Sequence, residues 1–212
     1  MSSPDADTER SVADALARRV EHRRGEDSFW ARALREAGAV DRAVFETVAR
    51  TPTGELDVPL RRLSSAADFG GVWFALAAAL AVGGGERGRR AAVTGVASLG
   101  GSSVLVNGAI KTLVDRRRPD RRGLELFRAR HLPKPSSTSF PSGHAATSFA
   151  FAYGAAAHVP LLAVPLGLLA TAVAYSRVHT GVHYPGDVIV GSALGAGTAS
   201  LVEAIRERSG RR

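Results

Sequence analysis

Four long stretches without a charged side chain constrain the fold of this chain more than any other feature of its sequence. They are residues 69–85, 91–110, 145–176 and 188–202, the third interrupted only by His158 and Pro160. A membrane-spanning helix needs about 20 mostly apolar residues, within a range of roughly 17–25. Dividing the third stretch near His158 therefore gives five predicted spans. These are residues 69–85, 91–110, 142–158, 160–176 and 186–205.

The predicted spans are rich in Ala, Gly and Ser, which let membrane helices approach one another closely. The sequence therefore predicts an all-α membrane helical bundle of about five spans. A soluble, Ala-rich helical core is the alternative, but four such stretches in 144 residues are unusual for a small soluble domain. The chain has no cysteine, which excludes disulfides, thiolate metal sites and a cysteine nucleophile.

The N-terminal part of the chain differs from the rest in charge and pattern. Residues 1–68 carry 11 basic and 13 acidic side chains, whereas residues 69–212 carry 17 basic and 7 acidic ones. Residues 11–24 and 28–50 have the apolar periodicity of amphipathic helices, which suit either a membrane interface or packing on neighbouring helices. We expect an amphipathic N-terminal region over 1–57 and a membrane domain over 58–212. The polar first residues show no signal peptide.

Three polar islands interrupt the apolar part of the chain. They are K-T-L-V-D-R-R-R-P from Lys111, P-S-G-H ending at His144, and S-R-x5-H-x3-D over residues 176–187. In the five-span topology the loops 111–140 and 177–186 lie on the same side of the membrane, as does the start of the span at 142. The three islands can therefore converge on one pocket, and ionisable groups at such positions indicate a functional site.

The residue types in these islands suit phosphoryl transfer. Lys111, Arg118 and Arg177 would bring three fixed positive charges, which bind phosphate oxygens. Ser142 and Gly143 precede an apolar helix, whose free N–H groups also bind anions. Two histidines and one carboxylate complete the set: a His held by a carboxylate is an oriented nucleophile or base, and a second His can protonate a leaving oxygen. With the cations supplying charge stabilisation, this set requires no metal or other cofactor.

The motifs K-x6-R-P, P-S-G-H and S-R-x5-H-x3-D, complete and in this order, resemble those of the type 2 phosphatidic acid phosphatase (PAP2) superfamily. The resemblance covers roughly residues 60–205. It implies a haloperoxidase-like helical core and a metal-independent phosphatase.

The resemblance also implies a role for each matching residue. It makes His183 the nucleophile that forms a phosphohistidine, Asp187 the group that orients it, and His144 the general acid. The phosphate-binding residues would be Lys111, Arg118, Ser142, Gly143 and Arg177.

These observations predict a multi-pass cell-membrane enzyme that hydrolyses a lipid phosphate or diphosphate. Candidate substrates are a polyprenyl phosphate or diphosphate, phosphatidic acid, phosphatidylglycerol phosphate and a polyprenyl-phosphoryl sugar phosphate. The alternatives are a non-catalytic binder of phospholipid headgroups and a soluble acid phosphatase or haloperoxidase. The basic residues cluster beside apolar spans without interleaved aromatic residues, so no nucleic-acid partner is expected. The membrane side of the site, a homo-oligomer and the role of residues 1–40 stay open.

Overall fold

The computed structural model describes residues 29–121, 130, 132–133 and 136–210, and within these ranges it is helical without strands. The predicted helix over residues 11–24 lies outside the described residues. The chain divides into two compact units between Val40 and Asp41, inside helix α2 (Phe29–Arg50).

Helix α2 confirms the amphipathic helix predicted over residues 28–50. Its first half carries large exposed apolar side chains, with Phe29 and Trp30 in edge-to-face contact. Its second half, from Asp41 onward, buries Phe45 and Ala49 beside Val178 and the partly buried Tyr184. This second half belongs to the same unit as the helices of the predicted membrane domain.

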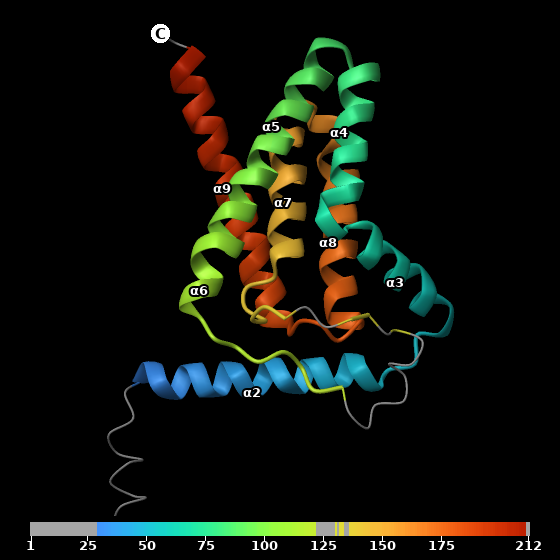
Figure 1. The fold of residues 1–212 in the computed structure, drawn as a ribbon, viewed down its shortest axis with the longest axis vertical. Helices are drawn as coiled ribbons and strands as arrows, with labels where there is room; N and C mark the ends of the chain where they lie inside the picture. The colour runs from blue at the N-terminus through green and yellow to red at the C-terminus, as the bar shows by residue number, and fades with distance from the viewer. Residues whose placement is uncertain (1–28, 122–129, 131, 134–135, 211–212) are drawn as a thin grey trace, which may run out of the picture. The chain divides into compact units, whose positions relative to one another are not determined.

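All five predicted spans are helical, with bounds that differ from the sequence expectation by a few residues. The second unit contains α3 (Asp57–Ala66), α4 (Gly71–Gly83), α5 (Gly85–Ser103), the π-helical segment η3 (Val104–Ile110), α6 (Lys111–Leu113), α7 (Gly143–Ala156), α8 (Ala163–His179) and α9 (Pro185–Gly210). Short 3-10 turns at Gly54–Leu56, Asp68–Gly70 and Pro160–Leu162 precede α3, α4 and α8 (Figure 1).

In the described part of the chain, three or four helices are long and apolar enough to cross a membrane, against about five predicted. Among the described residues, Gly85–Leu113, Pro160–His179 and Pro185–Gly210 are long and apolar enough, and the bent pair Gly54–Ala66 and Asp68–Gly83 could form a fourth span. Helices α4 and α7, with 13 and 14 residues, are shorter than a full span.

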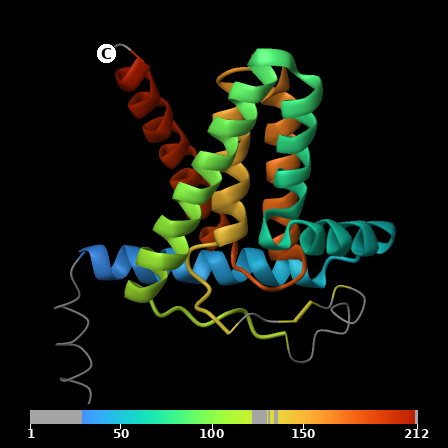
Figure 2. The same ribbon diagram turned by 45° about the horizontal axis from the view of Figure 1, so that its top comes forward.

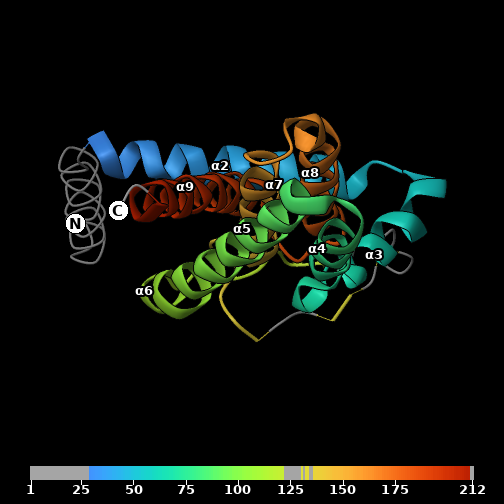
Figure 3. The same ribbon diagram turned by 90° about the horizontal axis from the view of Figure 1, so that it is seen from above.

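Helix α7 is the centre of the bundle. It contacts α5, α8 and α9, while α5 also contacts α4, and the view along the bundle shows α7 between these neighbours (Figure 3). Small residues make this close packing feasible. An added Cβ at Gly195 of α9 would lie 2.1 Å from the carbonyl oxygen of Ala146, and one at Gly154 of α7 would lie 2.6 Å from Ser98 Oγ.

The segments that carry the three polar islands meet at one end of the bundle. The chain after α6, the start of α7 and the end of α8 lie together there (Figure 2). The bend between α3 and α4 also faces this end, with Phe69 at φ 54° and Gly70 at φ 78° in the left-handed region. The convergence predicted from the topology is therefore present in the fold.

Candidate active site

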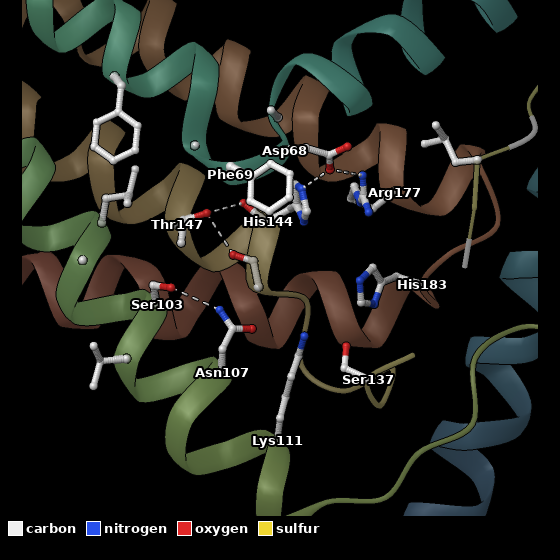
Figure 4. A pocket seen from close by; sticks show the side chains of 18 of the residues that line it. Asp68, Phe69, Ser103, Asn107, Lys111, Ser137, His144, Thr147, Arg177 and His183 are labelled. Carbon is white, nitrogen blue, oxygen red and sulfur yellow. Dashed lines mark hydrogen bonds and ion pairs between the residues drawn. The ribbon is translucent and has the colours of Figure 1, made fainter. Parts of the chain in front are cut away.

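A pocket of about 850 Å³ occupies the end of the bundle where the polar islands meet. Six of the eight residues predicted for the site line it: Lys111, Arg118, Gly143, His144, Arg177 and His183. They come from α6, the following loop, α7, α8 and the loop before α9 (Figure 4). The other two predicted residues, Ser142 and Asp187, are fully buried beside the lining residues. The structure thus brings all eight together.

His183 is placed by the tight turn between α8 and α9. Gly181 adopts φ 69° in this turn, and the backbone N–H groups of Val182 and His183 both donate to the carbonyl oxygen of Arg177. The imidazole is 2 % exposed, and its Nε2 lies 3.3 Å from Arg118 Nη1. The ring therefore presents Nε2 toward the cationic part of the pocket.

The other ring nitrogen of His183 faces Asp187. Nδ1 lies 3.5 Å from Asp187 Oδ2, within ion-pair distance, and has no hydrogen-bond partner among the described residues. Asp187 Oδ2 also accepts hydrogen bonds from Ser139 Oγ at 2.5 Å and from the Tyr184 N–H at 2.9 Å. The Asp187 carboxylate is thus fixed by Ser139 from the loop before α7 and by Tyr184 from the turn before α9. In this position it can orient the imidazole.

Burial lowers the pKa of His183 to about 4, and the positive charges of Arg118 and Arg177 act in the same direction. The Asp187 carboxylate, 3.5 Å from Nδ1, opposes this lowering of the pKa. The ring is consequently neutral near pH 7, with a lone pair on one nitrogen. A neutral imidazole beside the arginine side chains has the free lone pair that a nucleophile needs.

Arg118 joins the loop after α6 to the turn that carries His183. Its guanidinium donates to the carbonyl oxygen of Val182 at 2.7 Å, to Ser137 O at 3.0 Å and to Ser137 Oγ at 3.1 Å. Burial lowers the pKa of Arg118, but the group remains charged at any physiological pH. The hydrogen bonds hold the Arg118 guanidinium in one position, where its positive charge can bind an anion.

Arg177 is almost fully buried at the end of α8. Its Nη1 donates to Ser64 Oγ at 2.6 Å and lies 3.7 Å from Asp68 Oδ1. Lys111 directly follows the π-helical segment η3 and reaches the pocket from the opposite wall (Figure 4). Together with Arg118, these groups surround one side of the pocket with positive charge.

The start of α7 forms the floor beside these cations. Ser142 is the N-cap, its hydroxyl accepting from the Ala145 N–H at 3.4 Å. A Cβ at Gly143 would lie 2.8 Å from Asn107 Oδ1, so a larger residue would crowd the pocket wall. The start of a helix has free N–H groups that bind anions, and Gly143 at this start lines the pocket.

His144 follows on the first turn of α7 and contacts an acidic residue that was not predicted. Its Nε2 lies 2.8 Å from Asp68 Oδ1. The Asp68 carboxylate attracts a proton on this ring, whereas Arg177 and Lys111 repel it. One sequence signal pointed to Asp68: it is a lone carboxylate directly before the first charge-free stretch.

Other lining residues also escaped the sequence analysis. On the wall formed by the turn Asp68–Gly70, α4, α5 and η3 lie Phe69, Phe74, Leu99, Ser103, Val104 and Asn107. Asn107 donates to Ser103 Oγ at 3.2 Å, and Phe69 is fully exposed. The pocket therefore combines cationic and apolar side chains in its lining, and Phe69 lies beside His144 (Figure 4). Among the described residues, no group of three or more His, Asp or Glu side chains is arranged to hold a metal ion.

Comparison with known proteins agrees with this geometry. The model of the PAP2 superfamily matches residues 92–211, more than half of the chain. The chain belongs to the PAP2 superfamily. Its enzyme class is that of the PAP2-type phosphatases, as the motifs predicted.

Several phosphatases are similar in sequence. The decaprenylphosphoryl-5-phosphoribose phosphatase of Mycobacterium tuberculosis is 37% identical over 145 residues, which cover 66% of this chain and 76% of the relative. The phosphatidylglycerophosphatase B of Bacillus subtilis is 33% identical over 119 residues, covering 51% of this chain and 55% of the relative.

Two solved structures share the fold. The transmembrane PAP2-type phosphatidylglycerolphosphate phosphatase of Bacillus subtilis has a TM-score of 0.61 at 24% identity, covering 82% of this chain and 87% of its own. Aquifex aeolicus LpxE has a TM-score of 0.61 at 26% identity, covering 76% and 93%. With its apolar helices, this likeness makes the chain a membrane protein with the predicted all-α fold.

Proposed function

We propose that this protein is a multi-pass cell-membrane phosphatase that removes a phosphate from a lipid without a metal ion, through a phosphohistidine on His183. The observation that carries the proposal is the pocket itself. Its lining combines two histidines and three cations with apolar side chains such as Phe74 and Leu99. A lipid phosphate has the same two parts, a dianionic headgroup and an apolar tail.

In the first step, His183 Nε2 attacks the phosphorus while the bond to the leaving oxygen breaks. Arg118 lies 3.3 Å from the attacking nitrogen and, with Lys111 and Arg177, stabilises the charge that develops on the phosphoryl oxygens. His144 gives its proton to the leaving oxygen. Asp187 stabilises the positive charge that forms on the imidazole.

In the second step, a water molecule attacks the phosphorus of the phosphohistidine. His144, now neutral, takes the proton of the water, and the N–P bond breaks. Inorganic phosphate leaves, and both histidines return to their starting protonation states. The three cations perform the charge stabilisation that metal ions supply in other phosphoryl-transfer enzymes.

The substrate class we favour is a polyprenyl-phosphoryl sugar phosphate, because the relatives that act on decaprenylphosphoryl-5-phosphoribose are 35–37% identical to this chain. The pocket wall supports this choice. Between Lys111 and the apolar side chains of α4 and α5 lie the polar groups of Asn107, Ser103 and Thr147. Such groups suit the hydroxyls of a sugar placed between the reacting phosphate and the lipid tail.

The test is phosphate release by the purified protein in detergent micelles with EDTA present. The panel contains a polyprenyl-phosphoryl pentose phosphate, a polyprenyl diphosphate, phosphatidic acid and phosphatidylglycerol phosphate. We expect release that His183→Ala abolishes, with the pentose phosphate as the best substrate. EDTA-sensitive release would contradict the metal-independent mechanism, and an unchanged rate in His183→Ala would contradict the role of His183.

A further inference from the structure

We propose that Arg116, held by Asp41 of helix α2, is a positioning residue that fixes Asp187 and keeps His183 neutral. The inference rests on the proposed role of His183. Arg116 is not one of the eight residues predicted for the site, and Asp41 lies outside residues 92–211, which the PAP2 model matches. The proposal therefore adds part of the N-terminal helix to the catalytic machinery.

The contacts form a chain of alternating charges. Arg116 Nη2 donates to Asp41 Oδ2 at 2.5 Å, and Arg116 Nη1 donates to Asp187 Oδ1 at 2.7 Å. Asp41 Oδ1 accepts from the backbone N–H of Gly186, next to Asp187, at 2.7 Å. The Arg116 guanidinium therefore bridges the carboxylates of Asp41 and Asp187. The Asp41 carboxylate also binds the backbone N–H of Gly186, directly before Asp187.

Arg116 is fixed by more than its two ion pairs. Its guanidinium lies over the Tyr184 ring at 4.5 Å from the centroid, and the Tyr184 ring packs edge to face on Phe45 of α2 at 5.5 Å. Burial lowers the pKa of Arg116, but the paired carboxylates outweigh it and the net change raises the pKa. The group is therefore a permanent cation with a fixed geometry.

The buried carboxylate of Asp187 needs such a partner. It is fully buried, and a buried charge without a counter-ion is costly. His183 is neutral near pH 7, because burial lowers its pKa to about 4, so it does not supply the positive charge. Arg116 does. Because Arg116 occupies Oδ1, Asp187 faces His183 with Oδ2 alone, which is shared with Ser139 and the Tyr184 N–H.

Without Arg116, the one other ion-pair partner of Asp187 among the described residues is His183, 3.5 Å from Oδ2. The charged groups that face His183 are Asp187 from α9, Arg118 from the loop after α6, and Arg177 from α8. Without Arg116, the carboxylate draws a proton onto His183 more strongly. The acidic limb of the pH profile then moves toward neutral pH, and the neutral nucleophile becomes scarcer.

The first measurement is kcat and KM for phosphate release in detergent across pH, for wild type, Arg116→Gln, Arg116→Lys and Arg117→Gln. Arg117 is the adjacent, exposed arginine and serves as the matched control. We expect Arg116→Gln to lower kcat about tenfold, because a released Asp187 lets the nucleophile shift by a fraction of an ångström. KM should change little, because the phosphate-binding cations remain. Arg116→Lys restores part of the rate, and Arg117→Gln keeps wild-type values. Asp41→Asn should also lower kcat. The double variant Asp41→Asn/Arg116→Gln should have the same kcat as Arg116→Gln alone.

The second measurement does not require turnover. The ring nitrogens of His183 are titrated by NMR in histidine-labelled protein in detergent, with His183→Gln used to assign the signal. We expect Arg116→Gln to raise the pKa of His183, whether or not a lipid substrate is found. Active wild type with an unchanged titration and unchanged kcat in Arg116→Gln would overturn this inference and leave the proposed function intact. Inactive wild type with a shifted titration would overturn the function and leave the positioning intact.

Discussion

Replacing Gly191 of α9 by alanine tests how closely the packing of the bundle is coupled to the site. Gly191 faces the backbone of Ser142, and a Cβ there would lie 2.5 Å from the Ser142 carbonyl oxygen. Ser142 in turn donates its N–H to the Asp187 carbonyl oxygen at 2.9 Å. The start of α7, which carries Gly143 and His144, is thereby linked to the start of α9, which carries Asp187.

A small separation of α7 and α9 should have a large effect on stability and on kcat. A Cβ contact closer than 3.0 Å is essentially never seen, so the backbones of α7 and α9 must separate by at least about half an ångström. Crowding of this kind costs about 1–3 kcal/mol of stability. Since a misplacement of about 1 Å at reacting groups can cost a factor of about 100 in rate, we expect kcat to fall about tenfold.

Gly197 provides the matched control on the same helix. An added Cβ there meets no atom within 4 Å, so Gly197→Ala should keep wild-type kcat and thermal stability. The assay is phosphate release from a soluble aryl phosphate in detergent, together with thermal unfolding of each variant. If Gly191→Ala matches Gly197→Ala in both rate and melting temperature, the coupling between packing and site is refuted.

Three further predictions concern single site residues. Asp68→Asn should lower kcat for lipid substrates with poor leaving groups and barely affect an activated aryl phosphate, because Asp68 supports the protonated form of His144; the ratio of the two rates measures this. Arg118→Ala should raise KM and lower kcat together, since Arg118 both binds phosphate and holds the carbonyl of Val182, and steady-state kinetics with inorganic phosphate as inhibitor would show it. Because the folded pKa of His183 is about 4 and its ordinary value is 6.5, the unfolded chain takes up this proton first as pH falls. Melting temperature should therefore fall between pH 6.5 and 4, with a smaller decrease in His183→Gln; equal decreases would contradict the lowered pKa.

The helical architecture was readable from the sequence because charge-free stretches between polar islands leave few other solutions. The span count agrees only approximately: about five were predicted, and three described helices, or four with the bent pair, are long and apolar enough. Helix α7 has 14 residues and lies between α5, α8 and α9, so protein rather than lipid surrounds much of it. Hydropathy alone does not distinguish a buried helix in a bundle from a helix long enough to span the membrane.

The site was also largely readable, since three motifs at the ends of predicted spans meet at one end of the bundle. The contacts made by Asp68 and Arg116 could not be predicted from the sequence. Asp68 reaches His144 because of the bend at Phe69 and Gly70, whose dihedral angles no sequence periodicity announces. Arg116 lies in a run of arginines, and local sequence does not tell which of them turns toward Asp187.

Trapping a phosphoenzyme tests the central claim most directly. His144→Ala is mixed with a radiolabelled aryl phosphate in EDTA and quenched within milliseconds. An aryl leaving group needs little protonation, so the first step proceeds while hydrolysis, which needs His144 as base, is slow. The account predicts acid-labile, base-stable label on His183, approaching one phosphate per chain and absent when His183→Gln is added. Label that persists in the double variant, or phosphate release with no trapped label at any time, would contradict it.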